Sequence, residues 1–181
     1  MEKIDTLLRD VLPEAPGCPK VVALNAVRHA LNEWLRDGRG WQVRLTLTPA
    51  EDGGYEFEPL EGSVALALVH ARDAEGEVIP ARFSPPKRVE PEGDEPAHSA
   101  DVLLGLAEQA NEVPEWLLAK GAEAVAAGAK ARLLVMPGVE WSAPELGMHY
   151  RSVYRDHLSR FQLERARNFT TDPIRTAPSR F

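Results

Sequence analysis

The sequence predicts an α+β fold: a helical bundle, made of an N-terminal helix and two C-terminal helices, with an inserted small antiparallel β domain and an extended C-terminal tail. Apolar residues recur every three or four positions towards both ends of the chain, which is typical of amphipathic helices. Between residues 41 and 107 they alternate instead, which is typical of half-buried strands. The last 13 residues contain two prolines and no period, so they predict an extended segment.

The N-terminal helices are expected in residues 1–40. Residues 4–12 have helical spacing and predict a short helix that Pro13 ends. A longer helix begins at Pro19, because a proline is tolerated in the first turn, and runs to about Arg36. Its buried face is marked by one apolar stripe: Val21, Leu24, Val27, Leu31, Trp34 and Leu35.

The middle of the chain, residues 41–107, predicts an antiparallel β region. Its expected strands are residues 41–48, 55–58, 63–72, 77–83 and 100–106. The turn at 73–76 separates two of these strands and therefore indicates a hairpin. Residues 84–97 contain four prolines among charged side chains, so we expect a long exposed loop there.

Two helices are expected in residues 108–168. The first begins at Pro114 and ends near Met136, and it has alanines and glycines on several faces, so that neighbouring backbones can approach it closely. Ser142 and Glu145 then have the spacing of a capping box, with a proline between them at the first helical position. The last helix starts there and continues to the end of this segment. Its apolar side consists of Leu146, Tyr150, Val153, Tyr154, His157, Leu158 and Phe161.

The formal net charge of −7 is unevenly distributed along the chain. Residues 51–107 carry 13 acidic side chains against four basic ones, whereas residues 151–181 carry seven arginines against three acidic side chains. This polarity predicts that the basic end is attracted to an acidic surface of a partner. The alternative is that the acidic and the basic parts of the chain are both simply solvated faces.

Composition also restricts where the protein is found. No run reaches the roughly 18 consecutive apolar residues that a membrane-spanning helix needs. The N-terminus alternates charges and lacks the pattern of a secretory signal, so we expect a soluble protein that is made in the cytoplasm and has no membrane partner. Cys18 is the only cysteine, which excludes an internal disulfide and a cysteine-rich zinc site.

The sequence offers no recognisable catalytic, cofactor-binding or metal-binding residues. It has no glycine-rich phosphate loop, and its five histidines lack the spacing of metal ligands. Cys18, between Gly17 and Pro19, is more typical of a structural cysteine than of a nucleophile. Asp156 and His157 are neighbours on a helix and point about 100° apart, so they do not form an acid/base pair. We therefore expect a structural subunit without a cofactor, and not an enzyme.

Two blocks near the ends of the chain resemble a known family. Residues 12–30 contain a P-x-x-P-G-C-P turn that leads into a helix. The second block consists of residues 113–138, residues 141–146 and an arginine-rich helix that begins near Tyr150. The chain then ends with the short segment 173–181. In this order they resemble the head-to-tail adaptor proteins of tailed bacteriophages. The resemblance covers somewhat under half of the chain, and the β region matches only loosely.

The resemblance implies a ring, usually of twelve subunits, that lies beneath the portal protein at one capsid vertex and joins the capsid to the neck and tail. The implied partners are the portal protein, other copies of this chain and further neck or tail proteins, all in the neck of the virion. Packaged double-stranded DNA would pass through the channel without specific binding. An acidic β region that faced the channel or the next ring would repel the phosphates of this DNA.

The predicted portal-docking residues combine the basic last helix with the tail, residues 169–181. Ordinary disordered termini are polar, so apolar anchors among arginines favour a segment that docks on a partner. A frayed end without a function is the alternative. The residues expected to dock are Arg151, Arg155, Arg160, Arg165, Arg167, Phe169, Ile174, Arg175, Arg180 and Phe181.

Two other functions remain open. Stopper and tail-terminator subunits of the neck also form rings, but as a rule they lack a docking tail of this kind. From a different class, a regulatory DNA-binding or interaction module would need a basic face, and residues 151–167 are its only candidate. Binding to bare DNA with a steep salt dependence would identify such a module.

Overall fold

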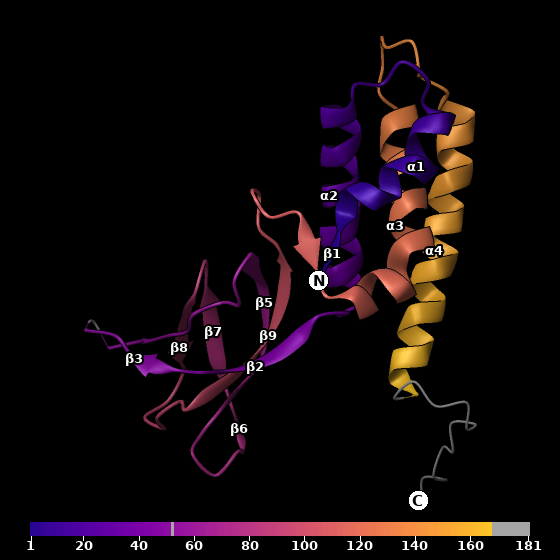
Figure 1. The fold of residues 1–181 in the computed structure, drawn as a ribbon. Helices are drawn as coiled ribbons and strands as arrows, with labels where there is room; N and C mark the ends of the chain where they lie inside the picture. The colour runs from indigo at the N-terminus through magenta and orange to yellow at the C-terminus, as the bar shows by residue number, and fades with distance from the viewer. Residues whose placement is uncertain (52, 168–181) are drawn as a thin grey trace, which may run out of the picture.

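The computed structural model describes residues 1–51 and 53–167 of the chain (Figure 1). It combines helices with antiparallel sheets, so the predicted α+β class is confirmed. The helices are η1 (Ile4–Leu7), α1 (Leu8–Val11), η2 (Leu12–Glu14), α2 (Lys20–Asp37), α3 (Glu115–Leu134) and α4 (Pro144–Ala166), where η marks a 3₁₀ helix. The strands are β1 (Glu2–Lys3), β2 (Gln42–Thr46), β3 (Thr48–Pro49), β4 (Tyr55–Glu56), β5 (Ser63–Arg72), β6 (Val78–Ile79), β7 (Ala81–Ser84), β8 (Arg88–Pro91), β9 (Ser99–Leu106) and β10 (Glu112–Val113).

Prolines set the starts of the three long helices. Both α2 and α3 begin at the residue after a proline, and α4 begins at Pro144 itself. The predicted capping box is wrong, because Ser142 lies one residue before the N-cap, Ala143, and no side chain caps this end. The Ser142 hydroxyl donates instead to the carbonyl of Leu134, at 3.5 Å. No helix in the described part of the chain is long and apolar enough to cross a bilayer.

Helix α3 packs against both α2 and α4, and the three stand side by side in Figure 1. Its glycines lie where neighbouring side chains come closest. A Cβ on Gly121 would lie 2.7 Å from the ring of Trp34, and one on Gly128 would lie 3.0 Å from Ala30 and from Tyr154. In a close-packed interior a methyl group at either position would force its neighbours to shift, so glycine is favoured at both.

The β region consists of two four-stranded antiparallel sheets, in the orders β2-β9-β5-β6 and β3-β4-β8-β7. Strand β9 is central: it pairs with β2 on one side and with β5 on the other, from Ser63↔Leu106 to Arg72↔Ser99. The predicted hairpin exists, because β5 and β6 pair across residues 73–77. The second arm of the hairpin, β6, is shorter than the predicted strand 77–83, because β7 pairs with β8 and not with β5. Strands β1 and β10 form a separate small sheet that the sequence did not predict.

The expectation that residues 84–97 form one long exposed loop is wrong. Strand β8 lies within this segment and pairs with β7 from Ser84↔Arg88 to Ala81↔Pro91. The side chain of Val89 is fully buried, and Ala97 is 4% exposed. Proline is tolerated at strand ends, and Pro91 ends β8, so these prolines delimit the strand and do not exclude it.

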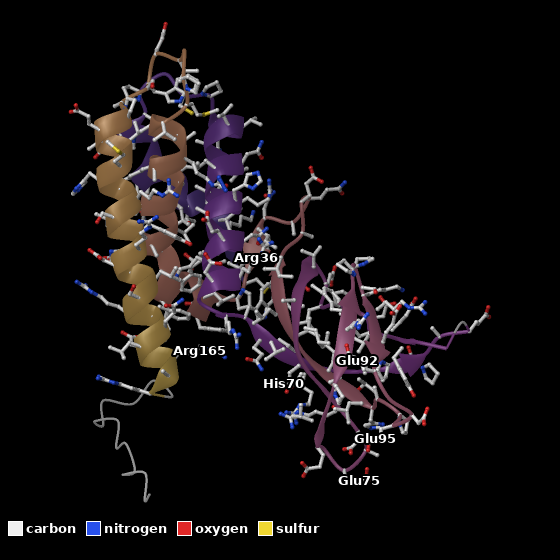
Figure 2. The ribbon with its side chains drawn as sticks, turned by 180° about the vertical axis from the view of Figure 1, so that it is seen from behind. Arg36, His70, Glu75, Glu92, Glu95 and Arg165 are labelled. Atoms are coloured by element: carbon white, nitrogen blue, oxygen red, sulfur yellow. The ribbon has the colours of Figure 1, made fainter. Side chains whose placement is uncertain are left out.

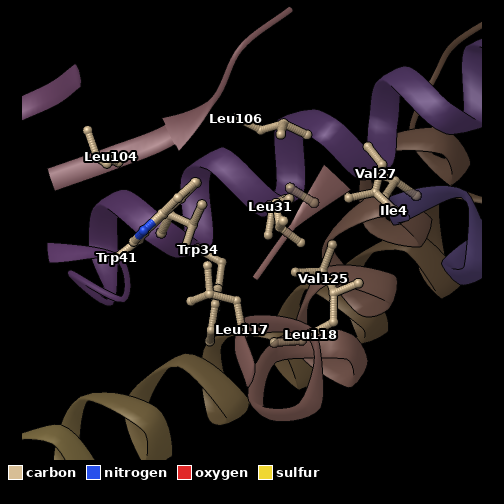
Figure 3. Packing of buried hydrophobic residues seen from close by; sticks show 14 of the residues in the cluster. Ile4, Val27, Leu31, Trp34, Trp41, Leu104, Leu106, Leu117, Leu118 and Val125 are labelled. Atoms are coloured by element: carbon tan, nitrogen blue, oxygen red, sulfur yellow. The ribbon is translucent and has the colours of Figure 1, made fainter. Parts of the chain in front are cut away.

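One continuous core joins the helices to the sheet that contains β9 (Figure 3). Leu31 and Trp34 of α2 face Leu117 of α3, while Leu104 and Leu106 of β9 belong to the same cluster. Two hydrogen bonds also join α2 to β9. The Asn32 side chain accepts from the Leu106 N–H at 2.7 Å and donates to the Leu106 carbonyl at 3.0 Å. The β region is therefore anchored to α2 and extends away from the bundle.

Candidate docking surface

Helix α4 carries the arginines that the sequence assigns to docking, and its packing decides which of them are free. Its most buried residues, Gly147, Tyr154 and Phe161, are seven positions apart and so lie along one line of the helix. Phe161 packs on Trp34 with ring centroids 4.5 Å apart. This line faces α3 and the C-terminal end of α2, and Tyr150, Val153 and Leu158 beside it are partly buried against the same core.

The predicted docking arginines do not share one face of α4. Arg151 and Arg155 are one turn apart and lie on the same flank. Arg160 follows Arg151 by nine positions, which places it on the opposite side of the helix axis at about 100° per residue. Arg167, the C-cap residue, follows Arg160 by seven positions and lies on its flank. The structure thus divides the basic helix into two separate surfaces.

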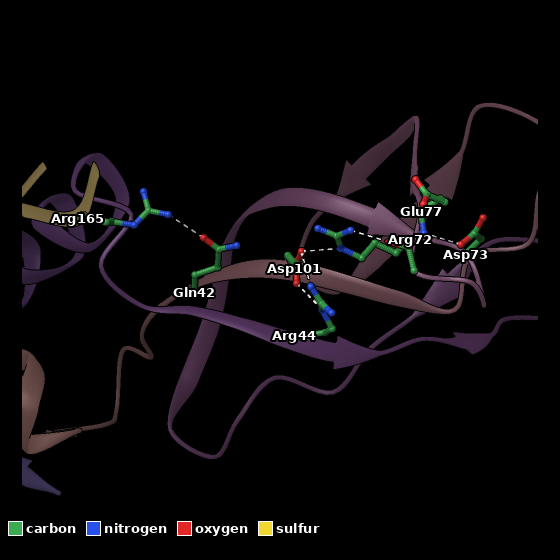
Figure 4. Close-up of polar contacts among 8 residues, drawn as sticks. Gln42, Arg44, Arg72, Asp73, Glu77, Asp101 and Arg165 are labelled. Carbon is green, nitrogen blue, oxygen red and sulfur yellow. Dashed lines mark hydrogen bonds and ion pairs between the residues drawn. The ribbon is translucent and has the colours of Figure 1, made fainter. Parts of the chain in front are cut away.

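Arg165 belongs to neither surface. Its guanidinium donates to the side-chain oxygen of Gln42, in β2, at 2.9 Å (Figure 4). Three residues earlier, the Gln162 amide donates to the Asp37 carbonyl at 2.9 Å. Arg165 therefore helps to fasten the end of α4 to the start of the β region, a contact that no sequence pattern indicated.

Arg151, Arg155 and Arg160 are exposed, and none of the three makes an ion pair or hydrogen bond with the described residues. They are the predicted docking arginines of α4 that are available to a partner. The other predicted docking residues, Phe169, Ile174, Arg175, Arg180 and Phe181, lie outside the described residues, as does Asn168, the expected end of the helix.

A groove of about 420 Å³ runs between α2 and α4, with α3 as its floor. The floor consists of small residues, Gly128 and Ala131, and the wall on α4 carries Arg151 and Arg155. The opposite wall, on α2, carries Glu33 and Asp37. Glu33 lies 3.6 Å from Arg132 of α3 and is partly neutralised by it. The sequence signal for this groove is weak and consists of the glycines at 128 and 147 in two neighbouring helices.

Tyr154 lies under the groove and is 7% exposed. Its hydroxyl is buried and has no hydrogen-bond partner among the described residues. Burial raises the pKa of Tyr154 well above its ordinary value, and the nearby carboxylates of Glu33 and Asp37 raise it further. The group is therefore a neutral hydroxyl with an unused proton at the base of the groove.

Among the described residues of the β region, Asp101 is the one charged side chain that is buried. Asp101 of β9 is 5% exposed and accepts hydrogen bonds from Arg44 of β2 at 2.8 Å and from Arg72 of β5 at 3.0 Å (Figure 4). Burial alone would raise the pKa of Asp101, but the bonds from the two guanidinium groups outweigh it and hold the pKa below its ordinary range. All three residues are engaged with one another, so the cluster ties three strands together.

The residues considered for chemistry are not gathered into a site. Within residues 1–51 and 53–167, no three histidine, cysteine, aspartate or glutamate side chains could hold a metal ion together. Cys18 is buried, and burial raises the pKa of its thiol, so the reactive thiolate is disfavoured. His157 lies 3.7 Å from Glu123 on α3.

Comparison with known proteins gives no family for the chain, because no family model and no curated protein matches it.

Proposed function

We propose that this chain is a structural subunit, a head-to-tail adaptor of the tailed-bacteriophage kind, which forms a ring beneath the portal and joins the capsid to the neck and tail. The observation that carries the proposal is the exposed arginines Arg151, Arg155 and Arg160 of α4, which make no ion pair with the described residues, followed in the sequence by segment 169–181 with its apolar anchors. Arginine side chains bind carboxylates in a fork geometry, and apolar anchors fill recesses, so the two together suit a protein partner.

In this proposal the α+β chain is a helical bundle with an inserted β domain and an extended tail. Helices α2, α3 and α4 form the subunit core, and the tail extends from α4 to the portal. The β region, which extends from α2 on the side away from α4, faces the channel or the next ring of the neck (Figure 1). Such a subunit has no catalytic or cofactor role.

Charge supports this placement of the β region. The sequence from 51 to 107 carries nine more acidic than basic side chains, and Glu61, Glu75 and Glu95 are exposed. A wall of this charge repels phosphates, so packaged DNA would slide past it without specific binding. A DNA-binding module requires the opposite charge on the surface that meets the duplex.

The first experiment tests binding to an assembled portal ring by pull-down and size exclusion. The full chain is expected to bind, and a chain that ends at Asn168 is expected to lose binding, because the anchors of the tail are removed. Arg160→Glu should weaken binding of the full chain, whereas the matched reversal Lys20→Glu, on an exposed position of α2, should not.

Equal binding of the full and shortened chains would contradict docking through the tail. If neither form bound the portal, a stopper or tail terminator would be the better assignment. Binding of the chain to bare double-stranded DNA, with a steep loss of affinity as salt rises, would favour the regulatory module instead.

A further inference from the structure

The groove between α2 and α4 has the features of a site for an acidic, partly apolar segment. Arg151 and Arg155 lie on one wall, one helical turn apart, exposed and without an ion pair among the described residues. Like charges at this spacing repel one another on a helix, and a bound carboxylate would relieve the repulsion. The apolar side chains of Val135 and Met148, which also line the groove, are 49% and 64% exposed.

The unused hydroxyl of Tyr154 adds a second, independent feature of the same groove. A buried hydroxyl without a partner costs free energy, and a hydrogen-bond acceptor that entered the groove would remove this cost. Glu33 and Asp37 already lie near the hydroxyl, so an uncharged acceptor is favoured there over another carboxylate. The peptide carbonyl of an inserted loop is such an acceptor.

The turn between β5 and β6 has the complementary features. Glu75 and Glu77 are exposed, and neither carboxylate makes an ion pair in the described part of the chain. Val78, directly after them, is 52% exposed. The turn thus presents two carboxylates and one apolar side chain, which match the arginines and the exposed apolar residues of the groove.

The turn is held rigidly. The Asp73 N–H donates to the Glu77 carbonyl at 3.1 Å, and the Glu77 N–H donates to the Asp73 carboxylate at 2.8 Å. Arg72 donates to the Gly76 carbonyl at 2.7 Å, and Gly76 has a φ of 89°, which favours glycine. Among the described residues, no hydrogen bond reaches the backbone carbonyls of residues 74 and 75. A preordered turn loses little conformational entropy on binding.

The groove and the turn cannot meet within one chain. Figure 2 shows Glu75 at the lower edge of the β region, and α4 on the side of the packed helices that faces away from that region. Complementary surfaces on opposite sides of one subunit can meet between copies. A head-to-tail contact of this kind generates a closed ring or an open filament, depending on the rotation between neighbours.

We infer that the groove between α2 and α4 receives the 73–78 turn of a second copy of this chain. The carboxylates of Glu75 and Glu77 accept hydrogen bonds from Arg151 and Arg155, and a peptide carbonyl of the turn accepts the proton of Tyr154. Val78 covers the exposed apolar side chains at the edge of the groove.

This contact rests on the proposed ring and makes it more specific. It assigns Arg151 and Arg155 to the contact between subunits, while Arg160, on the opposite flank of α4, remains for the portal. The basic helix that the sequence presented as one docking surface would then serve two partners, one on each side.

Paired charge reversal tests the contact. The groove variant is Arg151→Glu with Arg155→Glu, and the turn variant is Glu75→Arg with Glu77→Arg. Association is measured by sedimentation velocity at low salt and about 1 mM chain, a concentration at which weak contacts are populated. The wild-type chain is expected to associate and each variant alone to remain monomeric. An equimolar mixture of the two variants should associate again, because each groove then meets a turn of opposite charge.

Two further variants control the experiment. Arg160→Glu combined with Glu95→Arg reverses the same charges outside the contact and should associate like the wild type. Tyr154→Phe removes only the hydroxyl; it should leave the circular dichroism spectrum unchanged and weaken association about fivefold.

Several outcomes would overturn the inference. These are a wild-type chain that stays monomeric, a single reversed variant that associates like the wild type, and a mixture that associates no better than its components. A monomeric wild type that binds an isolated acidic peptide would assign the groove to a different protein. These measurements contain no portal, so a negative result would contradict the contact between copies and would not test portal docking. Conversely, failure to bind the portal would contradict the docking proposal and would not test the contact between copies.

Discussion

The packed helices α2, α3 and α4 share an apolar core with the β region, but the two regions differ in the close contacts that accompany this core. In the bundle, glycines at the helix crossings let aromatic side chains such as Trp34 and Tyr154 pack directly on the backbone of α3. In the β region, ion pairs join residues of the strands and of the loops beside them: Asp101 with Arg44 and Arg72, Lys87 with Glu56 and Glu58, and Arg82 with Glu92. Apolar packing responds little to pH, whereas a buried ion pair depends on it. The buried carboxylate of Asp101 should therefore make stability depend on pH through the β region, whereas truncation of Trp34 should lower stability at any pH.

The largest effect is expected from truncating the buried aromatic residue of the bundle. Trp34 is fully buried and contacts Phe161 and the backbone at Gly121, so Trp34→Ala leaves a cavity between helices. We expect the free energy of unfolding to fall by about 4 kcal/mol. Urea unfolding followed by circular dichroism at pH 7 and pH 4 measures it. A loss that changed strongly between the two pH values would contradict the assignment of this region to apolar packing.

The next effect should come from the buried carboxylate of the β region. Asp101→Asn keeps the shape but removes the charge that binds two guanidinium groups, and we expect a loss of about 2 kcal/mol at pH 7. Because the folded-state pKa of Asp101 is lowered, its contribution is present above the unfolded pKa of about 4 and is lost as pH falls through the folded value.

The difference between the wild type and Asp101→Asn should accordingly shrink below about pH 4. Denaturant unfolding of both proteins from pH 7 to pH 3 measures this. Asp94→Asn, at an exposed position in the same region, is the matched control and should behave like the wild type throughout. A gap that stayed constant down to pH 3 would exclude the ion pairs as its cause.

The smallest effect on the free energy of unfolding is expected from substituting single glycines, one in α3 and one in the β region. Gly121→Ala places a methyl group 2.7 Å from the Trp34 ring, and we expect a loss of about 1.5 kcal/mol despite the better helix propensity of alanine. Gly93→Ala, in the β region, meets nothing within 4 Å and should leave the stability unchanged. Thermal unfolding of both variants compares them. Equal behaviour of the two would show that the bundle relaxes around the added methyl group.

Local signals predicted the helices well and the pairing of strands poorly. The prolines before α2 and α3 and at the start of α4 locate these helices, because a helix start depends on a few neighbouring residues. The order β2-β9-β5 depends on partners up to about 60 residues apart, which no local pattern encodes. Strand β8 was missed because its prolines, which lie at or beyond its ends, were interpreted as loop residues.

The candidate site shows the same limit. The arginines of α4 could be identified from composition, but their separation onto two flanks required the line of buried residues through Tyr154. The sequence placed Tyr154 on the apolar side of the helix, which agrees with its burial. That its hydroxyl has no partner among the described residues depends on how α2 and α3 pack against it, and the bond of Arg165 to Gln42 joins residues more than 100 positions apart.

The central position of β9 also governs how the chain can fold during synthesis. Within the described residues β9 is the only neighbour of β2, and it pairs with β5 along nearly all of that strand. Neither strand can acquire this neighbour until residue 106 has left the ribosome. Until then the uncharged stretch 63–69 is an open strand edge on a nascent chain, the kind of segment that chaperones bind and that aggregates when they do not. Translation of β9 is thus the step that gives this edge its partner.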